Sequence, residues 1–268
     1  MTLDECRRFY AEEIRLAAGV KTPALVEAFA RVPRERFLGP GPWQVATADI
    51  GCGGVSYLPT DDADPRWLYH NVAVALDASL NLNNGQPGTL ARWIDELKLK
   101  PGDRVYHVGC GVGYYTAIIA EVVGPTGRVV AIEFEPPLAA RAKENLSSYR
   151  NVEVHAGDGA AFDPGTSDAI VINAGVTHPH PAWLDRMADG GRLIFPLTIT
   201  MGPSLGKGVM FLITREKDRF PLRVVTVVAI YSCASVRDPA LEPLLAKAFA
   251  GGALFTMKSV RRDPHDPV

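Results

Sequence analysis

Three glycines follow a short apolar run in the stretch YHVGCGVGYYT, residues 106–116. Gly109, Gly111 and Gly113 have the spacing G-x-G-x-G. The run RVYHV before them predicts a strand, and YTAIIAEVV after them predicts a helix. Glycine lets the backbone approach a ligand closely and adopt a positive φ, and the free N–H groups of a helix start point at the same spot. By itself the motif fits a ligand loop and a tight strand-to-helix turn equally well.

Two acidic residues downstream indicate a nucleoside ligand. Glu133 ends the next predicted strand, RVVAIE, at roughly the 20-residue distance at which an acid binds ribose hydroxyls in nucleotide-binding βαβ units; a solvated acid at a strand end is the alternative. Asp158, in HAGDGAAF, is able to accept the exocyclic amine of adenine, although an Asx-type turn explains it equally well. Tyr114 stands where a dinucleotide fingerprint requires glycine. We therefore expect a nucleoside-sized ligand without phosphates, such as S-adenosylmethionine.

The elements that must position these loops alternate from residue 87 onward. RVYHV, RVVAI, VEVH, DAIVIN and GRLIFP each fit a buried strand, and segments such as PPLAARAKENL between them fit helices. This alternation predicts a parallel sheet with helices on both faces, with the three loops at the carboxyl ends of successive strands. GVMFLIT and RVVTVVAIY, joined by the charged connector REKDRFPL, predict an antiparallel hairpin.

The two ends of the chain differ from this core. Residues 2–37 predict helices with a break at residues 19–22, whereas residues 44–86 lack a clear period and predict a long irregular region, usually a functional feature in a compact domain. DPALEPLLAKAFA predicts a further helix, and RRDPHDPV a frayed tail. We expect N-terminal helices with an irregular cap or substrate region over residues 1–86, a Rossmann-like cofactor-binding core over 87–235, and a C-terminal helix and tail over 236–268.

Composition narrows the class of protein. The chain has 268 residues, 47% of them hydrophobic, which is enough for one substantial core. A formal net charge of -2 disfavours nucleic acid or an anionic membrane as a partner. Scattered cysteines predict reduced thiols and no metal site: Cys6, Cys52, Cys110 and Cys233. The N-terminus lacks a secretory signal, and no run approaches the roughly 20 apolar residues that span a bilayer, so we expect a cytoplasmic protein.

Over most of residues 7–230 the chain resembles the protein-L-isoaspartate O-methyltransferase family, which belongs to the class I S-adenosylmethionine-dependent methyltransferases. The matching segments are VPRERFL, GQPGTLARWIDELKLKPGDRVYHVGCGVGYYTAIIA, IEFEPPLAARAKENL, GDG, and SDAIVINAG with HPAWLDRMADGGRLIFPL. VPRERF upstream of GQP is the most specific of them. The resemblance implies a Rossmann-like fold with a seven-strand, mostly parallel sheet, helices on both faces and one antiparallel strand.

The resemblance also implies roles for single residues. Gly109, Gly111 and Gly113 would line the methionine part of the cofactor, and Glu133 would hold the ribose. Phe134 would lie beside the adenine, with Asp158 and Gly159 at its edge. Asn173, which follows the fourth strand, joins the same cofactor-binding set.

At two positions the chain departs from the family pattern. The family carries a serine or threonine, regarded as the active-site residue, directly before QP or AP, and here that residue is Gly85. Asn84 or Asn83 is able to supply an amide donor nearby, and an Asn-Gly turn before Pro87 is the alternative. His107 stands where the family usually has an acid beside the cofactor's amino group. Neutral imidazole is able to accept a hydrogen bond there, whereas a protonated one would repel the ammonium; a buried histidine bonded to the backbone is the alternative.

These observations predict a methyltransferase that acts on a carboxylate of a peptide or a small molecule. A carboxylate is already ionised at pH 7 and needs no general base. A small-molecule O- or N-methyltransferase is an alternative, because an amine or phenol would need a base and His178, His180 and Asn173 are candidates. A non-catalytic S-adenosylmethionine-binding module is another alternative. A nucleic-acid methyltransferase is disfavoured by the low net charge.

Overall fold

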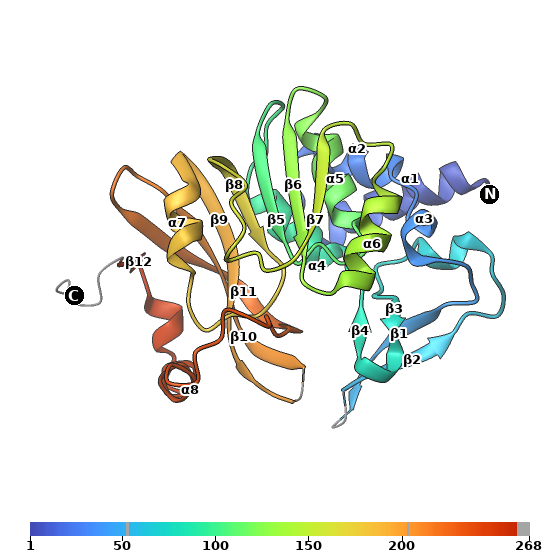
Figure 1. The fold of residues 1–268 in the computed structure, drawn as a ribbon. Helices are drawn as coiled ribbons and strands as arrows, with labels where there is room; N and C mark the ends of the chain where they lie inside the picture. Colours follow the sequence, from blue (N-terminus) through green and yellow to red (C-terminus); the bar gives the residue numbers. More distant parts are fainter. Residues whose placement is uncertain (52–53, 203, 262–268) are drawn as a thin grey trace.

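An eight-stranded sheet runs through the middle of the molecule (Figure 1). The computed structural model describes residues 1–51, 54–202 and 204–261. The strand order is β12-β11-β10-β9-β8-β5-β6-β7. The strands are β5 (Arg104–Val108), β6 (Arg128–Glu133), β7 (Val152–Ala156), β8 (Ser167–Ile172), β9 (Met187–Thr200), β10 (Leu205–Thr214), β11 (Phe220–Tyr231) and β12 (Ser259–Val260).

The direction of pairing divides the sheet into two parts. The five strands from β9 to β7 pair in parallel, whereas β9, β10, β11 and β12 pair antiparallel. This confirms the predicted α/β class, with its mostly parallel sheet and C-terminal antiparallel hairpin. The two-residue strand β12 is an eighth strand that the sequence did not indicate.

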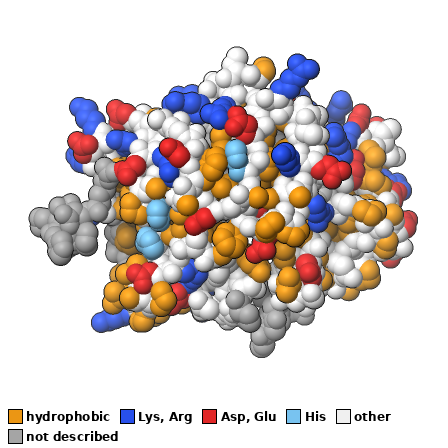
Figure 2. Space-filling model, viewed as in Figure 1, with side chains coloured by type: hydrophobic (Ala, Val, Ile, Leu, Met, Phe, Trp, Pro, Cys, Tyr) orange, Lys and Arg blue, Asp and Glu red, His pale blue; other side chains and the backbone are white. Residues whose placement is uncertain are grey.

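Successive strand residues point to opposite sides of the sheet, so both faces carry apolar side chains. Helices cover both of these faces. On one face lie α1 (Leu3–Ala18), α2 (Pro23–Arg31), α4 (Pro87–Glu96), α5 (Tyr114–Val123) and α6 (Pro136–Asn145). On the other lie α7 (Pro181–Arg186) and α8 (Glu242–Ala250), while the short α3 (Glu35–Leu38) follows α2. None of the helices in the described ranges is both long and apolar enough to cross a membrane. On the face shown in Figure 2, acidic and basic side chains are interspersed.

Local signals set the ends of the N-terminal helices. Thr2 caps α1: its hydroxyl accepts from Glu5 N (3.2 Å), and the Glu5 carboxylate accepts from Thr2 N (2.7 Å). Gly19 ends the helix with a φ of +66°, a conformation that glycine adopts without strain. Pro23 then opens α2. The break expected at residues 19–22 is therefore confirmed.

The region expected to be irregular contains ordered strands, so that prediction was wrong for part of residues 44–86. Strands β1 (Gln44–Gly51) and β2 (Gly54–Pro59) form an antiparallel pair, and β3 (Ala75–Asp77) pairs with β4 (Leu82–Asn83). None of the described side chains in β1 and β2, those of residues 44–47 and 55–59, is buried. A two-stranded arm that buries neither face has no reason to alternate apolar and polar residues, so the sequence carries no period-2 signal.

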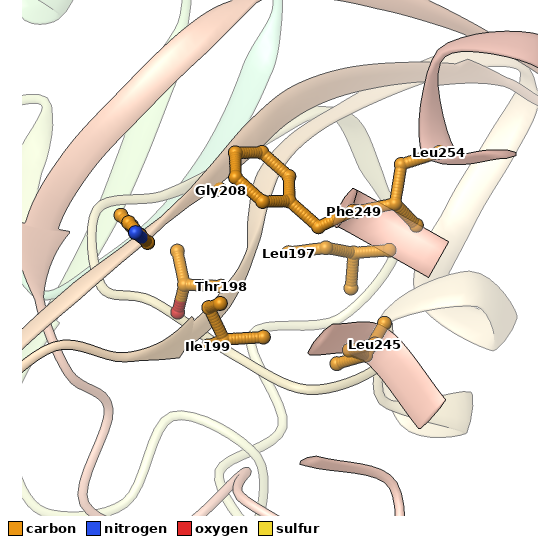
Figure 3. A pocket seen from close by; sticks show the side chains of 8 residues that line it. Leu197, Thr198, Ile199, Gly208, Leu245, Phe249 and Leu254 are labelled. Carbon is orange, nitrogen blue, oxygen red and sulfur yellow. The ribbon is translucent and has the colours of Figure 1, made fainter. Parts of the chain in front are cut away.

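The C-terminal extension packs across the outer strands. Arg237 donates to Gly175 O (3.2 Å) and to Thr198 O (3.2 Å), and it pairs with Glu242 at the start of α8. Side chains of α8 pack on the outer strands around a narrow gap that has no room for a water molecule (Figure 3). Its lining comprises Leu197, Thr198, Ile199, Lys207, Gly208, Leu245, Phe249 and Leu254. The extension is thus a packed part of the domain, separate from the glycine loop.

Two sequence expectations fall partly outside the described residues. Cys6, Cys110 and Cys233 are free thiols, whereas Cys52 lies outside the described residues. The same holds for residues 262–268 of the expected tail.

Candidate active site

The glycine loop joins the carboxyl end of β5 to α5, and two of its three glycines, Gly111 and Gly113, have different surroundings. Gly109, Gly111 and Gly113 all have positive φ, at +75°, +56° and +91°. A Cβ on Gly113 would lie 2.7 Å from Leu146 Cδ1, so glycine there lets α5 pack closely. A Cβ on Gly111 would meet nothing within 4 Å, so this residue faces open space. Gly111 is therefore the point at which a ligand is able to approach the backbone.

Glu133, the last residue of β6, places its carboxylate against this loop. Oε2 accepts a hydrogen bond from Gly111 N (2.7 Å), and Oε1 accepts one from Glu135 N (3.2 Å). Its side chain is 7% exposed, and burial raises the pKa of the carboxyl while the backbone N–H donors oppose that rise. Each carboxylate oxygen has a further lone pair, so Glu133 is able to accept two hydroxyl donors from a ligand.

Asp158, after β7, supplies a second carboxylate at the same edge of the sheet. The loops are adjacent because Gly157 N donates to Glu133 O (2.9 Å). Asp158 Oδ1 accepts from Ala160 N (2.9 Å), as expected for an Asx turn, and also from Ser235 Oγ (2.7 Å). Sequence reasoning missed Ser235, since no motif connects a serine after β11 with a loop 77 residues earlier. None of the hydrogen bonds found among the described residues involves Oδ2, so this oxygen is able to accept one from a ligand.

The two expected neighbours of adenine, Phe134 and Gly159, differ in their surroundings. Phe134 is 48% exposed and directly follows Glu133, so its ring is able to pack against a base. A Cβ on Gly159 would lie 2.4 Å from Val108 Cγ1. The carbonyl of Gly159 accepts from Tyr106 Oη (2.9 Å) and from an indole N–H (2.9 Å). Gly159 thus packs the loop onto β5.

His107 is a buried, neutral histidine. It is 1% exposed, and Nδ1 lies 3.0 Å from Thr116 Oγ1. The expected backbone partner is therefore a side-chain hydroxyl, while Nε2 is buried without a partner among the described residues. Burial lowers the pKa of His107 to about 4. At pH 7 the imidazole is uncharged and does not repel a cation.

Tyr114 does not act on the ligand in the way that its size indicated. Its side chain is 1% exposed; its hydroxyl lies 3.2 Å from Tyr10 Oη, and its ring packs edge-on against Phe37 with a centroid distance of 5.5 Å. The loop disfavours a pyrophosphate for another reason. Residues 109–113 carry no basic side chain, and the carboxylate of Glu133 already occupies Gly111 N. Negative charge at this point repels a phosphate and favours hydroxyl and amine donors.

The turn before α4 contains Asn83, Asn84 and Gly85, and it is an Asn-Gly turn. Gly85 has a φ of +76°, and its N–H donates to Asn83 Oδ1 (2.9 Å). Asn84 Oδ1 accepts from Val74 N (2.9 Å), and Nδ2 is buried, so this amide faces the protein interior. Tyr115 Oη donates to Gly85 O (3.1 Å) and joins the turn to the first turn of α5.

This geometry predicts the outcome of placing the family's serine at residue 85. A left-handed backbone costs a non-glycine residue about 1–2 kcal/mol, and a Cβ on Gly85 would lie 2.8 Å from Leu90 Cδ2. We expect Gly85→Ser to lower the free energy of unfolding by about 1–2 kcal/mol in urea titrations. The control is Gly202→Ser, where a Cβ meets open space, with an expected change below about 0.5 kcal/mol. Equal stability of Gly85→Ser and the wild type would contradict this account of the glycine.

The candidate site residues after β8 lie in different places: Asn173 contacts the glycine loop, and His180 caps a helix. Asn173 Nδ2 donates to Gly109 O (3.3 Å), which places this amide against the glycine loop. His180 Nδ1 accepts from Ala182 N (3.3 Å) and caps α7. Burial lowers the pKa of both His178 and His180, so both are neutral at pH 7. The cap gives His180 a structural role.

Comparison with known families agrees with this geometry. The family model described as protein-L-isoaspartate(D-aspartate) O-methyltransferase matches residues 11–227. A protein-L-isoaspartate O-methyltransferase of Aeropyrum pernix is 33% identical over 202 residues, covering 72% of this chain and 67% of its own. One from Rhodopseudomonas palustris is 30% identical and covers 75% of this chain and 81% of its own.

Solved structures show the same fold. A Plasmodium falciparum protein described as a protein-L-isoaspartate O-methyltransferase, in complex with S-adenosyl-L-homocysteine, is 18% identical with a TM-score of 0.62. The match covers 84% of this chain and 97% of that structure. The residues matched by the family model run from α1 through the glycine loop, Glu133 and Asp158 to β11. The chain belongs to the protein-L-isoaspartate O-methyltransferase family.

Proposed function

We propose that the protein transfers a methyl group from S-adenosylmethionine to a carboxylate, with isoaspartyl residues of peptides as the first candidate acceptor. The observation that carries this proposal is the position of the Glu133 carboxylate, 2.7 Å from Gly111 N at the carboxyl end of β6. Asp158 supplies a second carboxylate on the adjacent strand end. Two acceptors beside the glycine backbone at Gly111, where a Cβ would meet nothing within 4 Å, suit the ribose hydroxyls and adenine amine of a nucleoside. Family membership supports the same assignment.

The acceptor groups at the ends of β6 and β7 suit the nucleoside part of such a cofactor. When bound, S-adenosylmethionine supplies an electrophilic methyl group on a sulfonium. Glu133 would accept the ribose hydroxyls, Asp158 Oδ2 would accept the adenine amine, and the exposed Phe134 would pack on the base. The proposed set also includes Asn84, His107 and Gly159, which would act by supporting the loops. Its other members are Gly85, Gly109, Gly111, Gly113 and Asn173.

A carboxylate acceptor requires no catalytic base from the protein. Because its reference pKa is about 4, it is ionised at pH 7 and needs no base, so catalysis consists mainly of alignment. Gly85 offers no side chain to the acceptor, which must be held by backbone groups and neighbouring residues. Of the two histidines considered as bases for an amine or phenol acceptor, His180 caps a helix. His178, also after β8, is neutral.

The assigned role of Asp158 predicts a base preference. We expect S-adenosylhomocysteine to bind about tenfold more tightly than its inosine counterpart, because replacing the amine by a carbonyl places two acceptors face to face. Asp158→Asn, whose amide is able to donate, is expected to lose most of that preference. Isothermal titration calorimetry measures both ligands, and Asp163→Asn, at an exposed aspartate paired with Arg186, is the control. If Asp158→Asn still prefers S-adenosylhomocysteine to its inosine counterpart to the same extent, Asp158 does not contact the adenine amine.

Methyl transfer itself tests the proposed function. The purified protein is incubated with labelled S-adenosylmethionine and an isoaspartyl peptide, and the same peptide with ordinary aspartate is the control. Base-labile label on the isoaspartyl peptide alone is the expected result. Cofactor binding without transfer to any carboxylate would favour a non-catalytic module, and transfer to an amine or phenol would favour small-molecule chemistry. Failure to bind either cofactor form would overturn the proposal.

A further inference from the structure

Arg34 is buried near the N-terminal helices and has no acidic partner among the described residues. Arg34, at the start of α3, is 0% exposed. In the described part of the chain, none of the hydrogen-bond partners of its guanidinium is a carboxylate. An unpaired charge is costly to remove from water, so it is retained where several well-placed acceptors surround it. The acceptors around Arg34 therefore indicate what the residue does.

The guanidinium donates to a stretch of irregular backbone and to one side chain. Nη1 donates to the carbonyl oxygens of Leu68 (2.7 Å) and His70 (3.2 Å). Nη2 donates to Val72 O (2.7 Å) and to Asn84 Oδ1 (3.3 Å). A planar fork of five N–H groups holds several acceptors in one fixed arrangement, which a lysine ammonium is unable to do.

Asn84 carries this restraint into the turn at residues 83–85. Its Oδ1 also accepts from Val74 N (2.9 Å). Within the turn, Gly85 N donates to Asn83 Oδ1 (2.9 Å), and Gly85 O accepts from Tyr115 Oη (3.1 Å). The turn is thus held between the Arg34 network on one side and the first turn of α5 on the other.

Two tyrosine rings flank the same guanidinium. Its Cζ lies 5.9 Å from the ring centroids of both Tyr10, in α1, and Tyr114, the first residue of α5. The negative face of an aromatic ring attracts a cation, most strongly where water is excluded. Arg34 therefore contacts α1, α5 and the segment 68–84 at a single point.

We propose that Arg34 is a positioning residue whose guanidinium fixes the turn at residues 83–85 against the helix that follows the glycine loop. The turn includes Gly85, the position at which the family carries its active-site hydroxyl. With no hydroxyl there, the backbone of the turn shapes the acceptor side of the site. A misplacement of about 1 Å far from the reacting atoms is able to cost about a hundredfold in rate.

Hydrogen exchange tests the structural part of the proposal without using activity. We expect amide exchange in peptides spanning residues 68–86 to be at least about tenfold faster in Arg34→Lys and Arg34→Met than in the wild type. Phe29→Leu is the matched control, because Phe29 is buried and packs edge-on against both Tyr10 and Tyr114. That variant is expected to keep exchange in residues 68–86 within about twofold of wild type. The Kd for S-adenosylhomocysteine is expected to change less than about threefold in all three.

A measurement on the wild-type protein covers the case in which a variant does not fold. Arginine side-chain ¹⁵N NMR is expected to show one guanidinium with slow Nη proton exchange and hindered rotation about Nε–Cζ, assigned to Arg34. Wild-type exchange rates in residues 68–86 of a folded Arg34 variant would overturn the proposal. So would a freely rotating Arg34 guanidinium in the wild type.

The kinetic consequence rests on the proposed function. With the isoaspartyl peptide as acceptor, Arg34→Lys is expected to lower kcat about tenfold while the KM for S-adenosylmethionine stays within about threefold; Phe29→Leu is expected to keep both. A fold defect alone would lower the active fraction without selecting kcat over cofactor affinity. If the wild type itself transfers no methyl group, the proposed function fails, whereas the exchange and NMR results still decide the role of Arg34.

Discussion

Replacing Glu133 with alanine is expected to weaken binding of S-adenosylhomocysteine about a hundredfold. In the wild type the carboxylate holds the N–H of Gly111 (2.7 Å) and offers its remaining lone pairs to the ribose hydroxyls. Hydrogen bonds to a charged group contribute about 1.5–3 kcal/mol each, and a hundredfold loss corresponds to about 2.7 kcal/mol. Glu133→Gln keeps one acceptor oxygen and is expected to lose about tenfold. Calorimetric titration measures both.

The control for this prediction is the next acidic residue, Glu135, whose side chain is exposed and makes no capping bond to α6. Glu135→Ala is expected to change the Kd less than about twofold, since its backbone N–H, which donates to Glu133, is retained. Binding by Glu133→Ala at wild-type affinity would show that the ribose does not lie at β6. Equal losses in the two alanine variants would point to a general loss of negative charge.

The same residue predicts how binding changes with pH. Burial raises the pKa of the Glu133 carboxyl above its usual value, so protonation begins at a higher pH than for an exposed glutamate. Ribose hydroxyls donate to the ionised form and not to a protonated oxygen. Affinity for S-adenosylhomocysteine is therefore expected to fall as the pH drops through that raised pKa, and the loss is expected to level off at about tenfold, the loss expected for the neutral Glu133→Gln. Glu133→Gln is expected to lack this dependence, and a parallel decline in both proteins would contradict the assignment.

The parallel core and its loops could be predicted from the sequence because their signals are local. Each buried strand is a short β-branched run, and Gly109, Gly111 and Gly113 directly follow the first of them. Parallel pairing brings the carboxyl ends of β5, β6 and β7 to one edge, so the contact of Glu133 with Gly111 follows from strand order. These features require no knowledge of distant side chains.

Other parts of the site depend on contacts that no local pattern encodes. Ser235 reaches Asp158 across 77 residues, and Arg34 reaches Asn84 across 50. The position of Tyr114 in the motif predicts that its bulk limits the ligand, whereas in the structure its side chain packs with Tyr10. In each case the sequence shows a polar or aromatic residue without showing which element will lie next to it.

The second large effect is expected from His107 as the pH is lowered. In the folded protein burial lowers its pKa to about 4, whereas an unfolded chain keeps the usual value of about 6.5. Above pH 6.5 the imidazole is neutral in both the folded and the unfolded protein, so it does not lower the free energy of unfolding. Between pH 6.5 and 4 the unfolded chain takes up a proton that the folded protein excludes, so stability is lost as the pH falls. The two pKa values correspond to about 3 kcal/mol in total.

His107→Asn removes this proton and isolates its contribution. Urea unfolding is measured at pH 7.5, 6.5, 5.5 and 4.5, and between the extremes the wild type is expected to lose about 2–3 kcal/mol more than the variant. A constant cost of the substitution cancels, because only the slopes are compared. Thr116→Val is the matched control: it removes the hydroxyl that lies 3.0 Å from Nδ1 but leaves the imidazole buried, so it is expected to keep the wild-type slope. Identical slopes in wild type and His107→Asn would show that the ring is accessible to protons. If Thr116→Val also loses the pH dependence of stability, the lowered pKa is due to the hydroxyl contact. If only His107→Asn loses it, the imidazole beside the glycine loop is neutral throughout the physiological pH range and does not repel a cation.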